Sequence, residues 1–215
     1  MPSKVTRAAV FIDGGFFINT NDYYVAVHPV KSNISLRGLL NFIRLEVSRL
    51  ERVDEKLCTI AEAHWFRGRF TTEQMGNHAG NEKKVYSMLL EERQFDDELI
   101  AAGIVQHLFP VHVSQDNGKA AEKGIDVWFS LEAYEVCLKK GYDYAVLIGG
   151  DRDYVPLVKK LTALGIKVLL LSWNMEYMLA GYKRAQRTSQ HLSNECSYVL
   201  QMEKLIDTMH NSVPH

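Results

Sequence analysis

The chain has 215 residues, of which 47% are hydrophobic and 24% are charged, and its formal net charge at pH 7 is −1. This length suits one well-buried α/β domain and leaves little room for two full domains. A net charge so close to zero excludes a chain-wide basic attraction to nucleic acid, so any polyanion has to be bound by local patches.

The cysteines and the first residues bear on the cellular compartment. Cys58, Cys137 and Cys196 are far apart and show no Cys-x-x-Cys spacing, which predicts buried thiols in a reducing environment. Residues 1–7 lead into the first expected strand without a hydrophobic signal region, and no apolar run is long enough to span a membrane. We therefore expect a cytoplasmic protein with no membrane association.

The first half of the chain predicts strands that alternate with helices. Ser35 is expected to cap a helix whose apolar residues share one face. In chain order, the expected elements are a strand at 8–12, a loop from Asp13 to Ser35, a helix at 36–50, a strand at 57–66, a polar loop to about residue 81, a helix from about 82 to 102 and a strand at 104–109.

The second half continues the alternation. The expected elements are a flexible loop at 114–119, a helix that starts near Asp126, a strand at 144–148, a helix at 154–164, a strand at 166–171, a helix at 176–182, a polar basic loop at 183–190 and a helix at 194–209. Strands alternating with helices imply a parallel sheet with helices on both faces, which is a three-layer α/β sandwich.

Aspartates directly follow two of the buried strands. Asp13 comes after the first apolar run, while Asp151 and Asp153 come after the run at 145–148 and its two glycines. Open α/β sheets bind their ligands at the carboxyl ends of the strands, so these acids are expected to face a site. Asp126, at the start of the middle helix, is a fourth candidate. Carboxylates a few ångströms apart repel, so if these acids converge they must hold protons or bind a cation, and a hard ion such as Mg²⁺ or Mn²⁺ fits.

The same acids have purely structural interpretations. Asp151 or Asp153 could cap the helix that follows, and Asp126 could stabilise its own helix through the helix dipole. Asp13 shows no capping pattern, because a glycine pair follows it directly. The sequence alone leaves capping and metal binding open for the other three.

Basic, aromatic and amide side chains in the expected loops are candidates for contacts with phosphate groups and unpaired bases, although solvated surface charge is the more common outcome. The candidates are Asn19, Arg67, Arg69, Lys123, Arg152, Trp173, Asn174, Lys183 and Arg184. The eight histidines show no His-x-x-x-His pair, which argues against zinc. The sequence also lacks a phosphate loop, a dinucleotide fingerprint and a serine-hydrolase elbow.

Several short motifs, taken together, resemble the NYN domain family, in the LabA-like (DUF88) branch of the PIN-like nucleases. Singly each motif is weak, but their order and the elements between them are fairly specific. The resemblance runs from about Val10 to Val199 and is carried by Phe11-Ile12-Asp13-Gly14, by Lys123-Gly124-Ile125-Asp126-Val127, by the run from Gly149 to Val158, and by Gly165-Ile166-Lys167-Val168.

The resemblance implies a PIN-like sandwich whose acids bind Mg²⁺ or Mn²⁺ and cut RNA. It assigns the metal and catalytic roles to Asp13, Asp126, Asp151 and Asp153. The family usually has Asn where this chain has Phe16, which suggests a shifted substrate preference or a weakened site; Asn19 is a candidate substitute. A second, milder departure is Gly149, where the family often has a small hydroxyl residue.

We therefore expect a metal-dependent endoribonuclease with RNA as its partner. The nuclease domain is expected at residues 7–200, between an extension at 1–6 and a C-terminal segment at 201–215. A catalytically idle RNA-binding module and a metal-dependent phosphatase for small phosphate esters are the alternatives. The sequence leaves a homodimer open.

Overall fold

A parallel sheet forms the centre of the molecule. The computed structural model describes residues 4–71, 74, 82–113, 120–121 and 124–211. Six strands pair in the order β10-β7-β6-β1-β2-β3, and every pair is parallel. The strands are β1 (Thr6–Asp13), β2 (Cys58–Arg69), β3 (Ile104–Pro110), β6 (Tyr144–Ile148), β7 (Lys167–Ser172) and β10 (Tyr198–Gln201).

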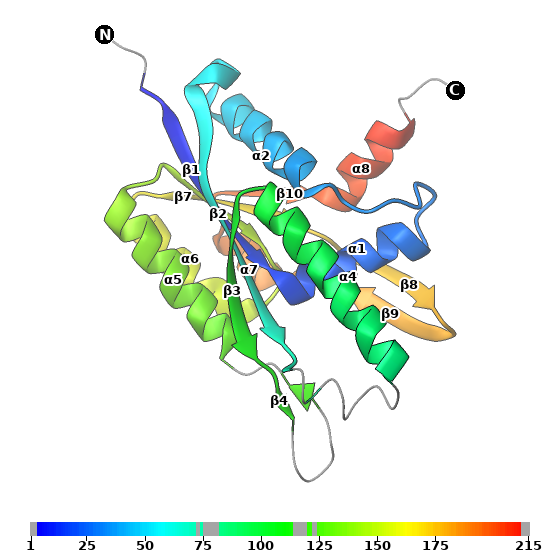
Figure 1. Cartoon of the computed structure of the whole chain (residues 1–215). Coiled ribbons are helices and arrows are strands. Elements are labelled where there is room, and N and C mark those ends of the chain that lie inside the picture. Colours follow the sequence, from blue (N-terminus) through cyan, green and yellow to red (C-terminus); the bar gives the residue numbers. More distant parts are fainter. Residues whose placement is uncertain (1–3, 72–73, 75–81, 114–119, 122–123, 212–215) are drawn as a thin grey trace.

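Helices cover both faces of this sheet (Figure 1). Alternate residues of each strand point to opposite faces, so β1 contributes Val10 to one hydrophobic core and Phe11 to the other. The first core lies under α1 (Gly14–Ala26), α2 (Leu36–Glu51), α4 (Glu82–Ala101) and α8 (Met202–Asn211); the second lies under α5 (Ile125–Lys140), α6 (Val155–Ala163) and α7 (Gln190–Glu195). The predicted three-layer α/β sandwich is confirmed.

The strand order reverses between β1 and β6. From β1 the chain continues to β2 and β3 on one side, and it later adds β6, β7 and β10 on the other side. Ile12 pairs with Ile148, so these two strands end at the same level. The segments after β1 and β6 therefore meet at a topological switch point, where doubly wound sheets bind ligands.

The predicted loop after Asp13 was wrong, because this segment forms α1. Two glycines at a helix start are unfavourable by propensity, but burial of Phe17 and Tyr24 against the sheet outweighs that cost. Gly14 is needed for close packing, since a Cβ there would lie 2.8 Å from both the Phe66 carbonyl oxygen and the Trp65 ring. Tertiary contacts decided this element.

The predicted helix at 176–182 and the basic loop after it were also wrong. This segment forms an antiparallel hairpin of β8 (Met175–Leu179) and β9 (Tyr182–Gln186). Its two-residue turn places both Ala180 (φ 50°) and Gly181 (φ 82°) in the left-handed region, as a tight hairpin requires. Alanine rarely adopts this conformation, so the turn had no clear signature in the sequence.

The single helix predicted at 194–209 is instead α7, β10 and α8. Tyr198–Gln201 pairs with β7 and extends the sheet at one edge. A four-residue edge strand depends on its neighbour rather than on its own sequence, which explains the error. The remaining short elements are η1 (Glu55–Leu57), β4 (His112–Val113), β5 (Ala120–Ala121) and η2 (Arg152–Tyr154).

The three cysteines are free thiols, of which Cys58 and Cys137 are buried and Cys196 is half-buried. Within the described residues, no helix combines the length and the apolar character needed to cross a bilayer. The expected loop at 114–119 lies outside the described residues.

Candidate active site

Tyr154 brings two of the predicted aspartates together. Its hydroxyl oxygen lies 3.0 Å from Oδ2 of Asp13 and 2.9 Å from Oδ1 of Asp126. Asp13 ends β1, Asp126 lies in the first turn of α5, and Tyr154 ends η2 after β6. Tyr154 is fully buried and its ring stacks on Phe129 with centroids 4.5 Å apart, so the position of the hydroxyl is fixed.

The Tyr154 hydroxyl has too few protons to donate a hydrogen bond to both carboxylates. A phenol has one hydrogen to donate, and an ionised carboxylate has none, so only one of the two contacts can be a hydrogen bond when both Asp13 and Asp126 are charged. Burial raises the pKa of the Tyr154 phenol, and the two carboxylates raise it further, so the phenol stays protonated. Burial also raises the pKa of Asp13, and the negative charge of Asp126 raises it further. The pair therefore favours an added proton or a cation.

Asp151 and Asp13 both line a shallow pocket of about 550 Å³ that is open to solvent. The Asp151 carboxylate caps η2 by accepting a hydrogen bond from the Asp153 amide at 2.9 Å. Capping and facing the pocket are thus combined in one residue. The pocket is lined by Asp13, Phe16, Asn19, Gly150, Asp151, Arg152, Gln186, Arg187, Thr188 and Ser189.

The structure does not bring all four aspartates together. Asp153 is exposed and does not line this pocket. Among the described residues, no three of the predicted aspartates have ligand oxygens that all lie within 4.8 Å of one another. Asp13 and Asp126 form the close pair, Asp151 shares the pocket with Asp13, and Asp153 stands apart.

The interpretation that Asp13 has no capping role was wrong. Its Oδ1 accepts a hydrogen bond from the Phe16 amide at 3.0 Å, which makes Asp13 the N-cap of α1. The role was hidden because α1 itself was not expected. The Asp13 carboxylate therefore has one oxygen on the helix N-terminus and the other on Tyr154, which fixes its orientation.

Phe16, the residue that departs from the family pattern, packs over the turn that follows β6. A Cβ at Gly150 would lie 2.4 Å from the Phe16 ring and 2.5 Å from the Arg187 carbonyl oxygen. Phe16 also contacts Trp173 edge to face, with ring centroids 6.2 Å apart. Its ring is half-buried and forms an apolar wall of the pocket beside Asp13.

Comparison with known proteins extends these observations. A family model described as the NYN domain matches residues 7–203. The chain belongs to the NYN domain family. A crystal structure of a protein of unknown function from Vibrio parahaemolyticus is similar, with 18% identity, a TM-score of 0.53, and coverage of 94% of this chain and 96% of that one. This likeness concerns the fold alone. No curated protein gave a significant match.

Membership of this family places the chain, at a coarse level, among the PIN-like nucleases. Divalent metal ions are typical of the family, and the close pair fits such an ion. Asp13 and Asp126 present only oxygen atoms and share one hydroxyl proton, and a third carboxylate, that of Asp151, lines the same pocket as Asp13. Hard oxygen ligands with excess negative charge suit Mg²⁺ or Mn²⁺.

Two predicted contact residues of the NYN domain make contacts within the fold. Trp173 is fully buried and its Nε1–H donates to the Tyr24 hydroxyl at 3.2 Å, so the prediction that it stacks on a base was wrong. Large indoles are usually drawn into cores, which outweighed its place at a strand end. Asn174 is exposed, and its Oδ1 accepts from the Thr188 amide at 2.9 Å, which fixes the backbone after β9.

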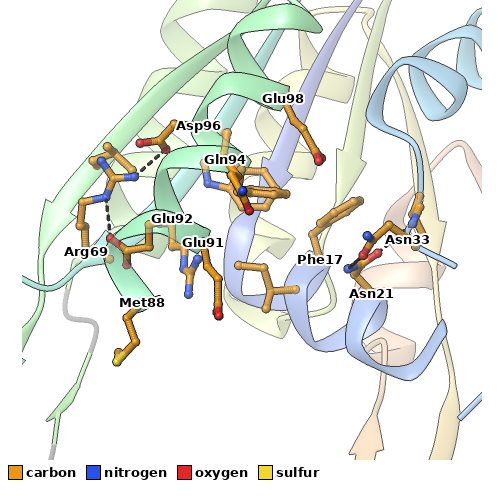
Figure 2. A pocket seen from close by; sticks show the side chains of 17 residues that line it. Phe17, Asn21, Asn33, Arg69, Met88, Glu91, Glu92, Gln94, Asp96 and Glu98 are labelled. Carbon is orange, nitrogen blue, oxygen red and sulfur yellow. Dashed lines mark hydrogen bonds and ion pairs between the residues drawn. The ribbon is translucent and has the colours of Figure 1, made fainter. Parts of the chain in front are cut away.

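Arg67 and Arg69 lie in a second pocket, of about 490 Å³, between α1, β2 and α4. Figure 2 shows Arg69 held by two acids of α4, Asp96 at 2.5 Å and Glu92 at 3.8 Å. Glu91 and Glu98 line the same pocket, which makes it acidic overall. Although this pocket is the better enclosed of the two, its charge does not suit RNA phosphates, so the site is assigned to the pocket beside Asp13.

The other predicted contact residues are spread over the surface. Arg152 and Asn19 line the pocket beside Asp13. Lys183 is exposed and pairs with Glu176 at 2.7 Å. Arg184 lies near Asp22. Burial raises the pKa of Asp22, and the positive charges of Arg67 and Arg184 only partly offset this rise. Lys123 lies outside the described residues.

Sequence reasoning missed two residues of the site. Tyr154 was taken only as the start of a helix, because its contacts with Asp13 and Asp126 join residues far apart in the chain and no local pattern marks them. Arg187 was grouped with a basic loop, whereas it follows β9 and lines the pocket, where it pairs with Glu176. Its placement depends on the hairpin, which the sequence pattern did not reveal.

Proposed function

We propose that this NYN domain is a metal-dependent endoribonuclease that hydrolyses phosphodiester bonds in RNA. The observation that carries the proposal is the convergence of Asp13 and Asp126 on the single hydroxyl of Tyr154 at the switch point of the sheet. Two carboxylates that share one hydroxyl proton are a cost to the fold, and such costs are typical of functional sites.

The residues of the site would divide the work as follows. Asp13 and Asp126, with Asp151 directly or through water, would hold Mg²⁺ or Mn²⁺. When bound, such an ion supplies positive charge to the phosphate and lowers the pKa of water. Tyr154 contacts both close carboxylates through its hydroxyl and fixes their orientation. Arg152 and Arg187 line the same pocket as Asp13 and would hold phosphates of the RNA.

The shape of the pocket favours a polymer over a small ester. It is shallow and open, so a chain can cross it, whereas a phosphatase for small phosphate esters needs an enclosed cavity. The half-buried face of Phe16 gives an apolar surface on which an unpaired base can stack. These features favour single-stranded RNA as the substrate.

Phe16 is also the reason to keep a second candidate function, an RNA-binding module without activity. A phenyl ring has no atom that can bind a metal or a phosphate, whereas the Asn usual in the family has both a donor and an acceptor.

Three free cysteines suit a reducing compartment, and we propose a cytoplasmic location for either function.

A cleavage assay separates these functions. Metal-stripped protein is incubated with labelled single-stranded RNA and Mg²⁺ or Mn²⁺, alongside Asp13→Asn, Asp126→Asn, Asp151→Asn and Asp153→Asn. The matched control is Asp97→Asn, which removes an equally negative charge from an exposed residue of α4. We expect cleavage by the wild type and the control, and its loss in the Asp13 and Asp126 variants. Asp153→Asn tests the one predicted aspartate that stands apart.

Each alternative has its own result. Binding of RNA without cleavage under either metal would establish the idle module, with Phe16→Asn as the variant to restore activity. Hydrolysis of p-nitrophenyl phosphate without RNA cleavage would establish the phosphatase. A metal-dependent rise in melting temperature that disappears in Asp13→Asn is expected for the nuclease, because an ion that binds only the native state stabilises it.

A further inference from the structure

A second cluster of ligand-type side chains lies on the face of the sheet that α5 covers. It consists of His64 on β2, His107 on β3 and Glu132 on α5. One ligand atom from each residue lies within 4.8 Å of those from the other two. Each residue comes from a different element, so no sequence pattern such as His-x-x-x-His announces this cluster.

The packing of the aromatic rings fixes both imidazoles. His107 stacks on Phe66 with centroids 4.4 Å apart, and Trp128 of α5 contacts it edge on at 5.1 Å. His64 stacks on Phe11 at 5.3 Å. Glu132 follows Trp128 by one helical turn, which directs it to the same side of α5. These ring contacts fix the positions of both imidazoles in the absence of a metal ion, and Glu132 lies beside them on α5.

The two imidazoles meet through one nitrogen atom each. Nδ1 of His64 lies 2.9 Å from Nε2 of His107, close enough for a hydrogen bond between the rings or for both nitrogens to bind one ion. Nε2 of His64 is buried and has no hydrogen-bond partner, but the Glu62 carboxylate lies 3.6 Å away. A histidine that binds a metal through one nitrogen usually donates its other N–H to a carboxylate. Glu62 is itself held by Lys140 at 2.5 Å and Tyr142 at 2.6 Å.

The contact between the two histidines also has an interpretation that involves no metal. A simple hydrogen bond between the two rings is the alternative. It would use the N–H of one ring and the lone pair of the other, and the contact of His64 Nε2 with Glu62 at 3.6 Å is the same in both cases, so zinc titration decides between them.

We propose that His64 Nδ1, His107 Nε2 and a carboxylate oxygen of Glu132 bind a Zn²⁺ ion, with Glu62 orienting His64. Two imidazoles and one carboxylate select zinc over Mg²⁺ or Mn²⁺, which prefer oxygen alone. His107 and Glu132 are half-buried, which gives the ion a route from solvent and leaves room for a water as fourth ligand. The ion links the edge strand β3 to β2 and α5.

This site is separate from the carboxylate pair at Tyr154. Asp126 and Glu132 both belong to α5, but they are six residues apart, which is about 9 Å along a helix axis. Between the two sites lie the rings of Phe66 and Phe129, whose centroids are 4.9 Å apart. Zinc binding here therefore does not depend on the proposed nuclease function.

Zinc affinity is measured on full-length, tag-free protein that has been stripped with a chelator. Zn²⁺ is titrated in competition with a chromophoric chelator, and Co²⁺ is used as a spectroscopic substitute. Asp13→Asn is included so that zinc at the carboxylate pair is not counted. In that background we test His107→Gln, Glu132→Gln and Glu62→Gln, with His191→Gln as a control on an exposed histidine of α7. Circular dichroism checks that each variant is folded.

We expect one zinc per chain for Asp13→Asn and for the His191 control in that background, and at least one for the wild type, with visible d–d absorption from tetrahedral Co²⁺. His107→Gln and Glu132→Gln should weaken binding by more than tenfold, and Glu62→Gln by about 10- to 100-fold, as for other groups that orient a ligand. The proposal is overturned if Asp13→Asn abolishes zinc binding, if the wild type binds no zinc at micromolar free metal, or if His107→Gln and Glu132→Gln both bind as the wild type does.

Discussion

At the scale of single residues, the hydroxyl of Tyr154 is the atom on which the proposed active site depends. It contacts both close carboxylates, while the ring beneath it is fully buried against Phe129. The ring therefore stabilises the fold by packing, and the hydroxyl orients the carboxylates of the site. A substitution that removes one oxygen atom can separate the two roles.

Tyr154→Phe is expected to fold normally and to cleave RNA about 10- to 100-fold more slowly at low metal concentration, the usual loss when a group that orients metal ligands is removed. Rate against Mn²⁺ concentration is the measurement. Saturating metal should recover part of the rate, because the two carboxylates remain. A loss that no metal concentration reduces would show that the hydroxyl acts on the substrate itself.

Asp13 gives a prediction for the dependence of stability on pH. Burial raises its pKa above the ordinary value of 3.8. Between the unfolded and the folded pKa the native state holds a proton that the unfolded state has released, so stability falls as pH rises through this window. Asn carries no charge at any pH and still accepts the capping hydrogen bond. Asp13→Asn should therefore gain stability relative to the wild type as pH rises.

The measurement is urea unfolding of both proteins in the presence of a chelator, at several pH values from acid to alkaline. The free-energy difference between variant and wild type should be smallest near the unfolded pKa and largest at alkaline pH. The same difference at every pH would mean that Asp13 is not destabilised by burial.

At the scale of elements, Asp151 both caps η2 and faces the pocket. Two substitutions distinguish these roles, because Asn keeps a capping oxygen and Ala does not. Asp151→Ala is expected to lower the free energy of unfolding by about 1 kcal/mol, whereas Asp151→Asn should stay close to the wild type. Both should reduce RNA cleavage. Chemical unfolding and the cleavage assay, run together, show whether capping alone accounts for the residue.

At the scale of the whole molecule, three distant segments meet at Gly150. They are the start of α1 with Phe16, the turn after β6, and the backbone of Arg187 after β9. A Cβ at Gly150 would lie 2.5 Å from a carbonyl oxygen that cannot rotate away, as well as 2.4 Å from the Phe16 ring. Gly150→Ala is therefore expected to destabilise the protein by about 1–3 kcal/mol, the usual cost of overpacking.

Thermal unfolding tests this prediction, with Gly38→Ala as the control. Gly38 is exposed in α2, and a Cβ there meets only the Ser35 side chain, at 3.3 Å. The control should retain or slightly gain stability, because alanine favours a helix. If Gly150→Ala is as stable as the wild type, the three segments are not closely packed. Recovery of stability by Phe16→Ala in the Gly150→Ala protein would identify the ring as the obstacle.

The sequence by itself determined the alternation of strands and helices, because buried parallel strands are continuous apolar runs and helices carry a periodic apolar face. It thereby placed Asp13 and Asp151 after neighbouring strands. Only the tertiary structure decided that α1 forms after two glycines, that 175–186 is a hairpin, and that Trp173 is buried. It also brought Tyr154 between two carboxylates and His64 beside His107. The physical reason is that these features depend on contacts between residues far apart in the chain, whose energies no local pattern contains.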